Sequence, residues 1–156
     1  MPRQARLIYD NVCYHIITRG NQKQTVFRDE NDCRAYLKLI SKYKERHKFK
    51  IYGWCLMNNH VHMVMESDSL SKAMHGINLS YAQYFRYRYK SVGHFWQDRY
   101  KSYVIQKDEY LINCISYIEY NPVRAKVALR PEDYAWSSYR ARILGEKGNL
   151  LDGLSL

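Results

Sequence analysis

The amino-acid sequence predicts an α+β fold whose elements follow one another in the order βαββαβα. Short segments rich in branched and aromatic residues are bounded by turn residues, and longer segments repeat apolar residues with a helical period. Pro122 marks the end of the last helix. This order suits an antiparallel sheet of the ferredoxin-like kind, with the helices packed mainly on one face.

The first strand is expected at residues 12–18, where β-forming residues end at the turn signal Arg19-Gly20-Asn21. Asp29 is a favourable N-cap for a helix that runs to about residue 47. Apolar residues recur there at i, i+3, i+4 and i+7, which predicts a buried stripe formed by Cys33, Tyr36, Leu37, Ile40 and Tyr43.

A hairpin is expected next, with strands at residues 51–57 and 60–65. Asn58 and Asn59 join the two strands. Asparagine tolerates the left-handed backbone that a tight two-residue turn uses, so these residues favour a short connection.

Two helices and one strand complete the predicted order. Ser69 is expected to cap a helix that runs towards Tyr89, and residues 102–106 form a short strand. Asp108 opens the last helix. This helix should stop near Asn121, because a proline disfavours helical geometry at the residue before it.

Length and composition predict one domain over residues 1–145 and a loosely ordered C-terminal tail over residues 146–156. A formal net charge of +10 favours a polyanionic partner, and 16 tyrosines, many beside cations, suit stacking on nucleic-acid bases. The sequence contains no signal peptide or membrane span, so a cytoplasmic location is expected. The wide spacing of the four cysteines argues against a cysteine zinc site and indicates ordinary buried thiols.

The segment that carries most chemistry is His60-Val61-His62, inside an apolar run. If the run is a strand, both imidazoles point to the same face of the sheet. Neutral imidazole is a common metal ligand, so two of them form half of a metal site.

The last helix carries the other candidate groups. On a helical wheel, Tyr117 and Asn121 share a face at the flank of the apolar stripe, whereas Tyr120 lies roughly opposite that stripe. Tyr117 is therefore expected at the boundary between helix and sheet, beside an amide that can bind a metal. By spacing alone, an ordinary boundary residue at Tyr117 and a helix C-cap at Asn121 are the favoured interpretation.

Four ordered blocks together resemble a known family, the single-tyrosine HUH transposases, and within it the REP-associated tyrosine transposases. The blocks are MNNHVH at 57–62, GHFWQDRYKS at 93–102, YIEYNPVRA at 117–125 and WSSY at 136–139. The segments Tyr14-His15-Ile16 and Thr18-Arg19-Gly20-Asn21 fit the pattern too, so the resemblance covers about residues 5–140. The chain departs from the family with Asn58 in place of proline and Glu119 in place of histidine.

The resemblance implies a metal-dependent transposase or nickase that cleaves and rejoins single-stranded DNA. In this reading His60, His62 and Asn121 bind one divalent cation, Mg²⁺ or Mn²⁺, and Tyr117 is the nucleophile that forms a 5′-phosphotyrosine intermediate. The implied substrate is a hairpin-forming palindromic repeat. On the wheel Glu119 points away from Tyr117, so its exchange is not expected to disable the metal site.

Cations and one tryptophan are expected to contact the DNA backbone and its bases. They are Arg86, Arg88, Lys90, Trp96, Arg99 and Lys101. No protein partner is evident, and the sequence is compatible with a monomer or a homodimer.

Two other functions remain compatible with the sequence. One is a non-catalytic nucleic-acid-binding module, because a ferredoxin-like sheet with surface aromatics and positive charge is also the plan of RNA-binding domains. The other is a metal nuclease that uses water as the nucleophile and forms no covalent intermediate.

Overall fold

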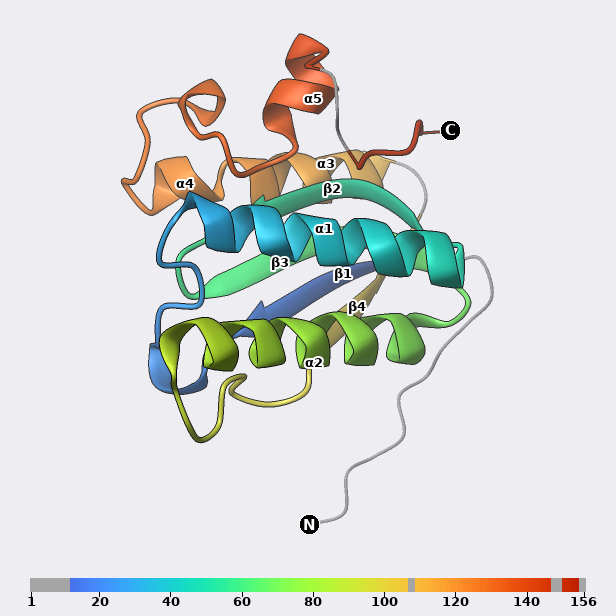
Figure 1. Ribbon diagram of the computed structural model, residues 1–156. Helices are drawn as coiled ribbons and strands as arrows, with labels where there is room; N and C mark the ends of the chain where they lie inside the picture. Colours follow the sequence, from blue (N-terminus) through green and yellow to red (C-terminus); the bar gives the residue numbers. More distant parts are fainter. Residues whose placement is uncertain (1–11, 107–108, 147–149, 155–156) are drawn as a thin grey trace.

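The computed structural model describes residues 12–106, 109–146 and 150–154 of the chain. The strands of this part form an antiparallel sheet with the order β2-β3-β1-β4 (Figure 1). Their bounds are β1 (Val12–Arg19), β2 (Lys50–Leu56), β3 (His60–Ser67) and β4 (Lys101–Ile105). The strand order and the antiparallel pairing confirm the predicted fold class.

The two long helices, α1 (Glu30–His47) and α2 (Leu70–Tyr89), lie side by side on one face of the sheet (Figure 1). We call this the core face. Alternate strand residues point into it, and Tyr14, Ile16 and Met63 are among its fully buried side chains. None of the described helices is both long enough and apolar enough to cross a lipid bilayer.

Helix α3 (Glu109–Glu119) lies on the opposite face of the sheet and contacts mainly β2 and β3. Its apolar residues Ile115 and Ile118 pack near Val64 in a second, smaller apolar cluster. Gly53 of β2 permits the close approach, since a Cβ atom there would lie 2.9 Å from the Ile115 side chain. The two long helices therefore share one face, and α3 covers only part of the other.

The helix boundaries test the predicted caps. Asp29 caps α1, because its side chain accepts a hydrogen bond from the Asp32 N–H at 3.0 Å. Ser69 stands at the N-cap position of α2 but makes no side-chain cap. Asp108 lies outside the described residues. Beyond α3 the backbone breaks at Tyr120 and restarts as α4 (Asn121–Arg124), which carries Pro122 in its first turn, where proline is tolerated.

The connection between β2 and β3 is the predicted two-residue turn, closed by the hydrogen bond from the Met57 N–H to the His60 carbonyl at 2.9 Å, but its backbone conformation differs from the expected one. Neither Asn58 nor Asn59 has the positive φ that the prediction assumed. The two residues instead offer their carbonyl groups to other segments: Asn58 accepts from the Val26 N–H at 2.7 Å, and Asn59 from the Gly20 N–H at 2.9 Å. The turn is thus shaped by long-range hydrogen bonds and not by a local preference for the left-handed region.

The chain after α4 covers the outer edge of β2. The Leu56 N–H donates to the Trp136 carbonyl at 2.8 Å, and the Ser138 N–H to the Trp54 carbonyl at 2.9 Å. The short helices η2 (Pro131–Asp133) and α5 (Tyr139–Leu144) flank this segment, and η1 (Asn21–Lys23) follows β1. Asp152 bonds to Ile51, so the described part of the tail is not loose as predicted. Exposed edge strands pair readily with other chains, and this covering prevents it on β2.

Candidate functional site

Three histidines gather on the sheet face that carries α3. The register pairs Arg19 with His60 and Ile17 with His62, so the odd-numbered residues of β1 and the even-numbered residues of β3 point to this side. His15 is the diagonal neighbour of His62 there. We call this side the histidine face.

His60 and His62 stand with their rings edge to face, the ring centres 5.0 Å apart. Each ring uses its Nδ1 atom: that of His60 lies 2.6 Å from Asn59 Oδ1, and that of His62 lies 3.0 Å from His15 Nε2. An amide oxygen only accepts, so Nδ1 of His60 carries the hydrogen and its Nε2 keeps a lone pair. Within the described residues neither Nε2 atom takes part in a hydrogen bond, which leaves both available to a further ligand.

Burial favours the neutral form of these rings. Loss of hydration lowers the pKa of His60 to about 4, with a smaller contribution from the Arg19 charge. Loss of hydration also lowers the pKa of His62 to about 3, and the neighbouring cationic groups act in the same direction. Both imidazoles are therefore neutral at pH 7, the form in which histidine binds metals.

The end of α3 and the start of α4 lie on the side of the histidines. Ile115 packs against Gly53, which pairs with Val64, and Cys55, two residues further along β2, pairs with His62. The charges of Glu119 and Arg124 act on Cys55, and that of Arg124 also acts on His62, so these two residues lie near the histidine end of the strands.

Arg124 of α4 joins the candidate nucleophile to the candidate amide ligand. Its guanidinium carbon lies 3.8 Å from the centre of the Tyr117 ring, and it donates to the Tyr117 carbonyl at 2.6 Å. It also donates to Asn121 Oδ1 at 3.4 Å. Tyr117 is 57% exposed, so this residue is accessible to a large substrate. Tyr120 contacts the ring of Tyr139 instead, at 6.2 Å between centres.

On the histidine face, Cys13 of β1 and Ile105 of β4 pack with α3, whereas the other end of these two strands is exposed. Lys101 pairs with Ile17 and Tyr103 pairs with His15, so both point to this side. The side chains of Arg19, Lys101 and Tyr103 are exposed. The histidines thus border an open, positively charged strip of sheet that carries an aromatic ring.

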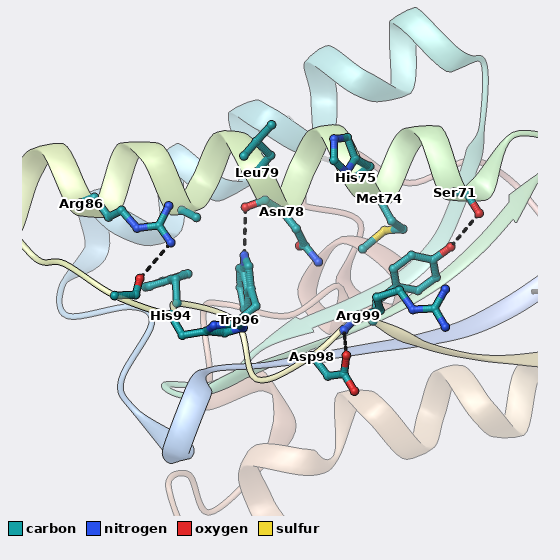
Figure 2. A pocket seen from close by; sticks show the side chains of 14 residues that line it. Ser71, Met74, His75, Asn78, Leu79, Arg86, His94, Trp96, Asp98 and Arg99 are labelled. Carbon is teal, nitrogen blue, oxygen red and sulfur yellow. Dashed lines mark hydrogen bonds between the residues drawn. The ribbon is translucent and has the colours of Figure 1, made fainter. Parts of the chain in front are cut away.

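Three of the other predicted DNA contacts, Arg86, Trp96 and Arg99, line a groove of about 860 Å³ between α2 and the segment 93–100 (Figure 2). Arg86 donates to the Gly93 carbonyl at 3.0 Å, and the Trp96 indole N–H donates to the Asn78 carbonyl at 2.9 Å. Lys90 ends α2, with its ammonium group 5.1 Å from the centre of the Tyr87 ring.

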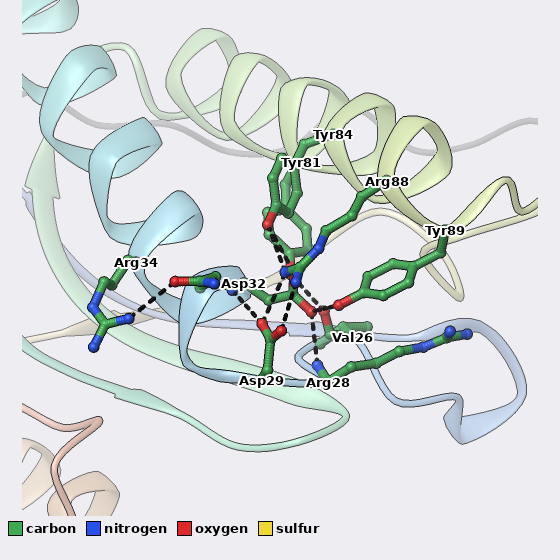
Figure 3. A network of polar contacts seen from close by, with 10 residues as sticks. Val26, Arg28, Asp29, Asp32, Arg34, Tyr81, Tyr84, Arg88 and Tyr89 are labelled. Atoms are coloured by element: carbon green, nitrogen blue, oxygen red, sulfur yellow. Dashed lines mark hydrogen bonds and ion pairs between the residues drawn. The ribbon is translucent and has the colours of Figure 1, made fainter.

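Arg88 has a different environment from the one that a phosphate contact requires. It binds Asp29 and the fully buried Asp32, each at 2.6 Å (Figure 3). Asp32 also accepts hydrogen bonds from the hydroxyls of Tyr84 and Tyr89. This network joins the start of α1 to the end of α2, and we therefore exclude Arg88 from the proposed DNA contacts.

Glu119 is directed away from the Tyr117 side, as the helical wheel predicts. Its carboxylate is fully buried, binds Arg142 and accepts a hydrogen bond from the Ser138 hydroxyl at 2.6 Å. It holds the segment after α4 against α3. The glutamate that stands here in place of histidine is thus paired with Arg142.

Sequence reasoning missed three residues that border the site. Arg19 was read only as a turn signal, Arg124 only as part of a motif, and Tyr103 was not singled out. The alternation of β1 contained a signal for Arg19, because it shares the parity of His15. Nothing local in the sequence indicated that Arg124 turns back onto Tyr117.

Comparisons with known proteins support the family resemblance and the fold. The family model described as "Transposase IS200 like" matches residues 8–121, which include both histidines, Tyr117 and Asn121. No curated protein matches the chain.

Two solved structures share the fold. A REP-associated tyrosine transposase bound to a REP hairpin matches with a TM-score of 0.74 and 19% identity, over 98% of this chain and 95% of its own. A putative transposase from Deinococcus radiodurans R1 matches with a TM-score of 0.52 and 13% identity, over 85% of this chain and 97% of its own. The family model spans most of the chain, and this protein therefore belongs to the IS200-like transposase family of DNA-processing enzymes.

Proposed function

We propose that this transposase cleaves single-stranded DNA at the foot of a hairpin and rejoins it through a covalent tyrosine intermediate. The observation that carries the proposal is that two elements on the histidine face carry groups suited to this chemistry. Strand β3 presents two neutral imidazoles with free Nε2 atoms, and the end of α3 presents an exposed phenol beside an amide and a guanidinium.

Tyr117 is the proposed nucleophile. Its hydroxyl oxygen attacks the phosphorus of a phosphodiester, a bond forms between phosphorus and the tyrosine oxygen, and the bond to the 3′-oxygen breaks. The phenol proton leaves the tyrosine, and the departing 3′-oxygen takes up a proton to become a 3′-OH. The new link conserves the energy of the cleaved bond, so the 3′-OH of another strand can reverse the step without ATP.

The charges around Tyr117 support this assignment. Arg124 lies over the ring and Arg19 borders the histidines, so both guanidinium groups stand where a phosphate would approach. Guanidinium groups stabilise charge that develops on phosphate oxygens. Arg124 also donates to the Tyr117 backbone carbonyl, which holds the guanidinium over the ring.

His60, His62 and Asn121 are the proposed ligands of a divalent cation, Mg²⁺ or Mn²⁺. The donor set fits, because both rings are neutral, both Nε2 atoms are free and the amide supplies an oxygen. The described residues contain no cluster of three histidine, cysteine or acidic side chains, so this site depends on the amide as its third ligand. When bound, the metal would polarise the phosphate and neutralise charge on it.

The proposed substrate is hairpin DNA with a single-stranded flank. The fold shared with a transposase bound to a REP hairpin supports this choice, as does the net charge of +10. Lys101, with Arg19 and Tyr103, would hold the strand on the open strip of the histidine face. Arg86, Lys90, Trp96 and Arg99 would act nearer to α2.

The test is to incubate the protein with hairpin DNA labelled at its 5′ or 3′ end, in the presence of Mn²⁺, and to look for covalent protein–DNA species. We expect an adduct on the 5′-phosphate side that is absent in Tyr117→Phe and present in Tyr120→Phe. Tyr120 is the matched control, because it is an exposed tyrosine in the same motif whose ring contacts Tyr139.

Each other outcome contradicts a stated part of the proposal. An adduct lost in Tyr120→Phe but retained in Tyr117→Phe would exchange the two tyrosines. Cleavage without any adduct would mean that water is the nucleophile. Binding of hairpin DNA without cleavage under any divalent metal would leave a non-catalytic binding protein.

A further inference from the structure

The third histidine of the histidine face, His15, takes no part in the proposed chemistry. Its Nε2 atom lies 3.0 Å from Nδ1 of His62, and the two rings stack with their centres 5.2 Å apart and their planes at 24°. This is a direct hydrogen bond between two imidazoles that stand 47 residues apart in the chain. Because it occupies Nδ1 of His62, it bears directly on Nε2 of the same ring, the atom proposed as a metal ligand.

The sheet holds His15 firmly in place. This residue lies in β1, the strand between β3 and β4, where it pairs with Val64 on one side and with Tyr103 on the other. The centre of the Tyr103 ring lies 6.1 Å from that of the His15 ring. A side chain on a strand that is paired along both edges is positioned more precisely than one on a loop, so the contact with His62 is a fixed part of this face.

His15 is not placed as a third metal ligand beside the other two histidines. Its Nε2 atom is directed at Nδ1 of His62, whereas the proposed ligand atom of His62 is Nε2, at a different corner of that ring. In the part of the chain that the structure describes, no three histidine, cysteine or acidic side chains are grouped so that they could hold a metal ion. Any effect of His15 on a bound cation must therefore pass through His62.

The hydrogen bond between the two rings can form in two ways, which differ in what they leave on His62. A neutral imidazole carries one hydrogen, either on Nδ1 or on Nε2. If His15 donates, the hydrogen of His62 stands on Nε2, and this atom cannot bind a cation. If His62 donates from Nδ1, its Nε2 atom keeps the lone pair that a metal requires. Metal binding is thus compatible only with His15 as the acceptor.

A partner at Nδ1 matters because a free imidazole has the opposite preference. A neutral histidine side chain in water carries its hydrogen mainly on Nε2, the form that cannot bind a metal through that atom. His60 also has a partner at Nδ1, since this atom lies 2.6 Å from Asn59 Oδ1. Both proposed ligand rings therefore show the usual arrangement around metal-binding histidines, in which the second ring nitrogen donates to a neighbouring group.

We propose that His15 is a positioning residue of the metal site: it accepts the Nδ1–H of His62 and thereby keeps the Nε2 lone pair of His62 available to a divalent cation. The hydrogen of His15 then stands on its own Nδ1 atom. The inference rests on the proposed function, because it takes His62 as a metal ligand. It assigns His15 no contact with the DNA or with the cation.

The first measurement identifies the tautomer directly and needs neither metal nor DNA. Long-range proton–nitrogen NMR spectra of nitrogen-15-labelled protein, at about pH 7.5, distinguish a neutral ring nitrogen that carries hydrogen from one that does not. We expect hydrogen on Nδ1 of His62 and a lone pair on its Nε2. In His15→Leu the His62 ring should shift towards hydrogen on Nε2. Hydrogen on Nε2 of His62 in the unaltered protein, or an unchanged ring in His15→Leu, would overturn the proposal.

The second measurement is the affinity for Mn²⁺, read from water-proton relaxation in the Tyr117→Phe background without DNA. His15→Leu should weaken Mn²⁺ binding by about 10- to 100-fold, the usual effect of losing such a partner. His15→Gln should restore most of the affinity, because its amide oxygen can accept from His62. The control is His47→Leu, which removes a ring that stacks on Tyr43 at 6.0 Å in α1; it should leave the affinity unchanged.

Equal Mn²⁺ affinity in His15→Leu and its parent, or equal losses in His15→Leu and His15→Gln, would mean that His15 does not position His62. The tautomer in the unaltered protein and the affinity of His15→Gln decide the matter even where His15→Leu does not fold. Failure of the proposed function is seen separately. If hairpin DNA gives no covalent adduct while Mn²⁺ affinity depends on His15 as stated, the nucleophile is rejected and the role of His15 stands.

Discussion

The same alternating strands give the sheet one face that is packed with apolar side chains and one face that carries polar rings. The core face buries aromatic and aliphatic side chains under α1 and α2. Between these helices, the fully buried carboxylate of Asp32 is bound by Arg88 and by the Tyr84 hydroxyl. The histidine face carries the largely buried rings of His60 and His62 and leaves the Nε2 atoms of these two rings free. A neutral imidazole with a free Nε2 atom can take a further ligand, so we propose that the histidine face is the side that binds one.

The contrast extends to the tyrosines. Tyr14, Tyr36 and Tyr81 are buried on the core side, where they contribute apolar area and ring contacts. Tyr103 and Tyr117 are more than half exposed on the other side. A composition rich in tyrosine thus serves both stability and binding, and substitutions should separate the two roles.

The largest expected effect is a loss of activity on the histidine face without a loss of stability. His62→Leu should lower the rate of adduct formation by about 10³-fold, because a metal contribution of several kcal/mol is lost. The free energy of unfolding should change little, since an apolar side chain replaces a buried polar ring. Adduct kinetics and urea denaturation of the same preparation test this; a large fall in stability would contradict it.

The converse is expected on the core face. Asp32→Ala should lower the free energy of unfolding by about 3 kcal/mol, because Arg88, Tyr84 and Tyr89 lose their shared partner. Arg34→Ala is the control: it removes an exposed i,i+4 ion pair with Glu30 and should cost less than about 0.5 kcal/mol. Urea denaturation measures both, and equal losses in the two variants would refute the role of the network.

An intermediate effect should appear as the pH falls. The unfolded chain has ordinary histidines that bind protons below about pH 6.5, whereas His60 and His62 stay neutral in the fold until about pH 4 and pH 3. Stability should therefore be full above pH 6.5 and decrease as the pH falls towards 4, by at most about 2 kcal/mol per ring at pH 5. Urea midpoints at pH 7 and pH 5 test this, and His62→Leu should show a shallower dependence.

The smallest effect is expected at the guanidinium that borders Tyr117. Arg124→Leu should slow adduct formation by about tenfold, because one charged hydrogen-bonding group is lost from the site. Stability should hardly change, since the Arg124 side chain is exposed. Arg130→Leu, an exposed cation of the same region, is the control; equal slowing in both variants would mean that Arg124 contributes only to the overall charge.

Much of the fold followed from local patterns. The period of 3.6 and the cap at Asp29 predicted α1, and the runs of β-formers predicted all four strands to within about two residues at each end. The patterns failed where a distant segment decides the outcome. Asn58 and Asn59 bond to residues 20 and 26–27, and the tail near Asp152 bonds to β2, so neither segment behaves as its composition indicated.

In the candidate site, too, local patterns predicted some features and missed others. Alternation predicted that His60 and His62 share a sheet face, and the helical wheel predicted that Glu119 points away from Tyr117. Local patterns did not indicate which groups Arg88 and Arg124 contact. One is bound by the carboxylates of α1, and the other lies over the ring of Tyr117.

The sequence by itself determined which residues share a face of each strand and helix, because the periods of 2 and 3.6 are local properties of the backbone. Only the tertiary structure decided which faces meet. Helix α3 lies over β2 and β3 because Gly53 admits Ile115, and the register of β1 against β3 brings His15 to His62. Such meetings depend on contacts between residues far apart in the chain, whose geometry no local period specifies.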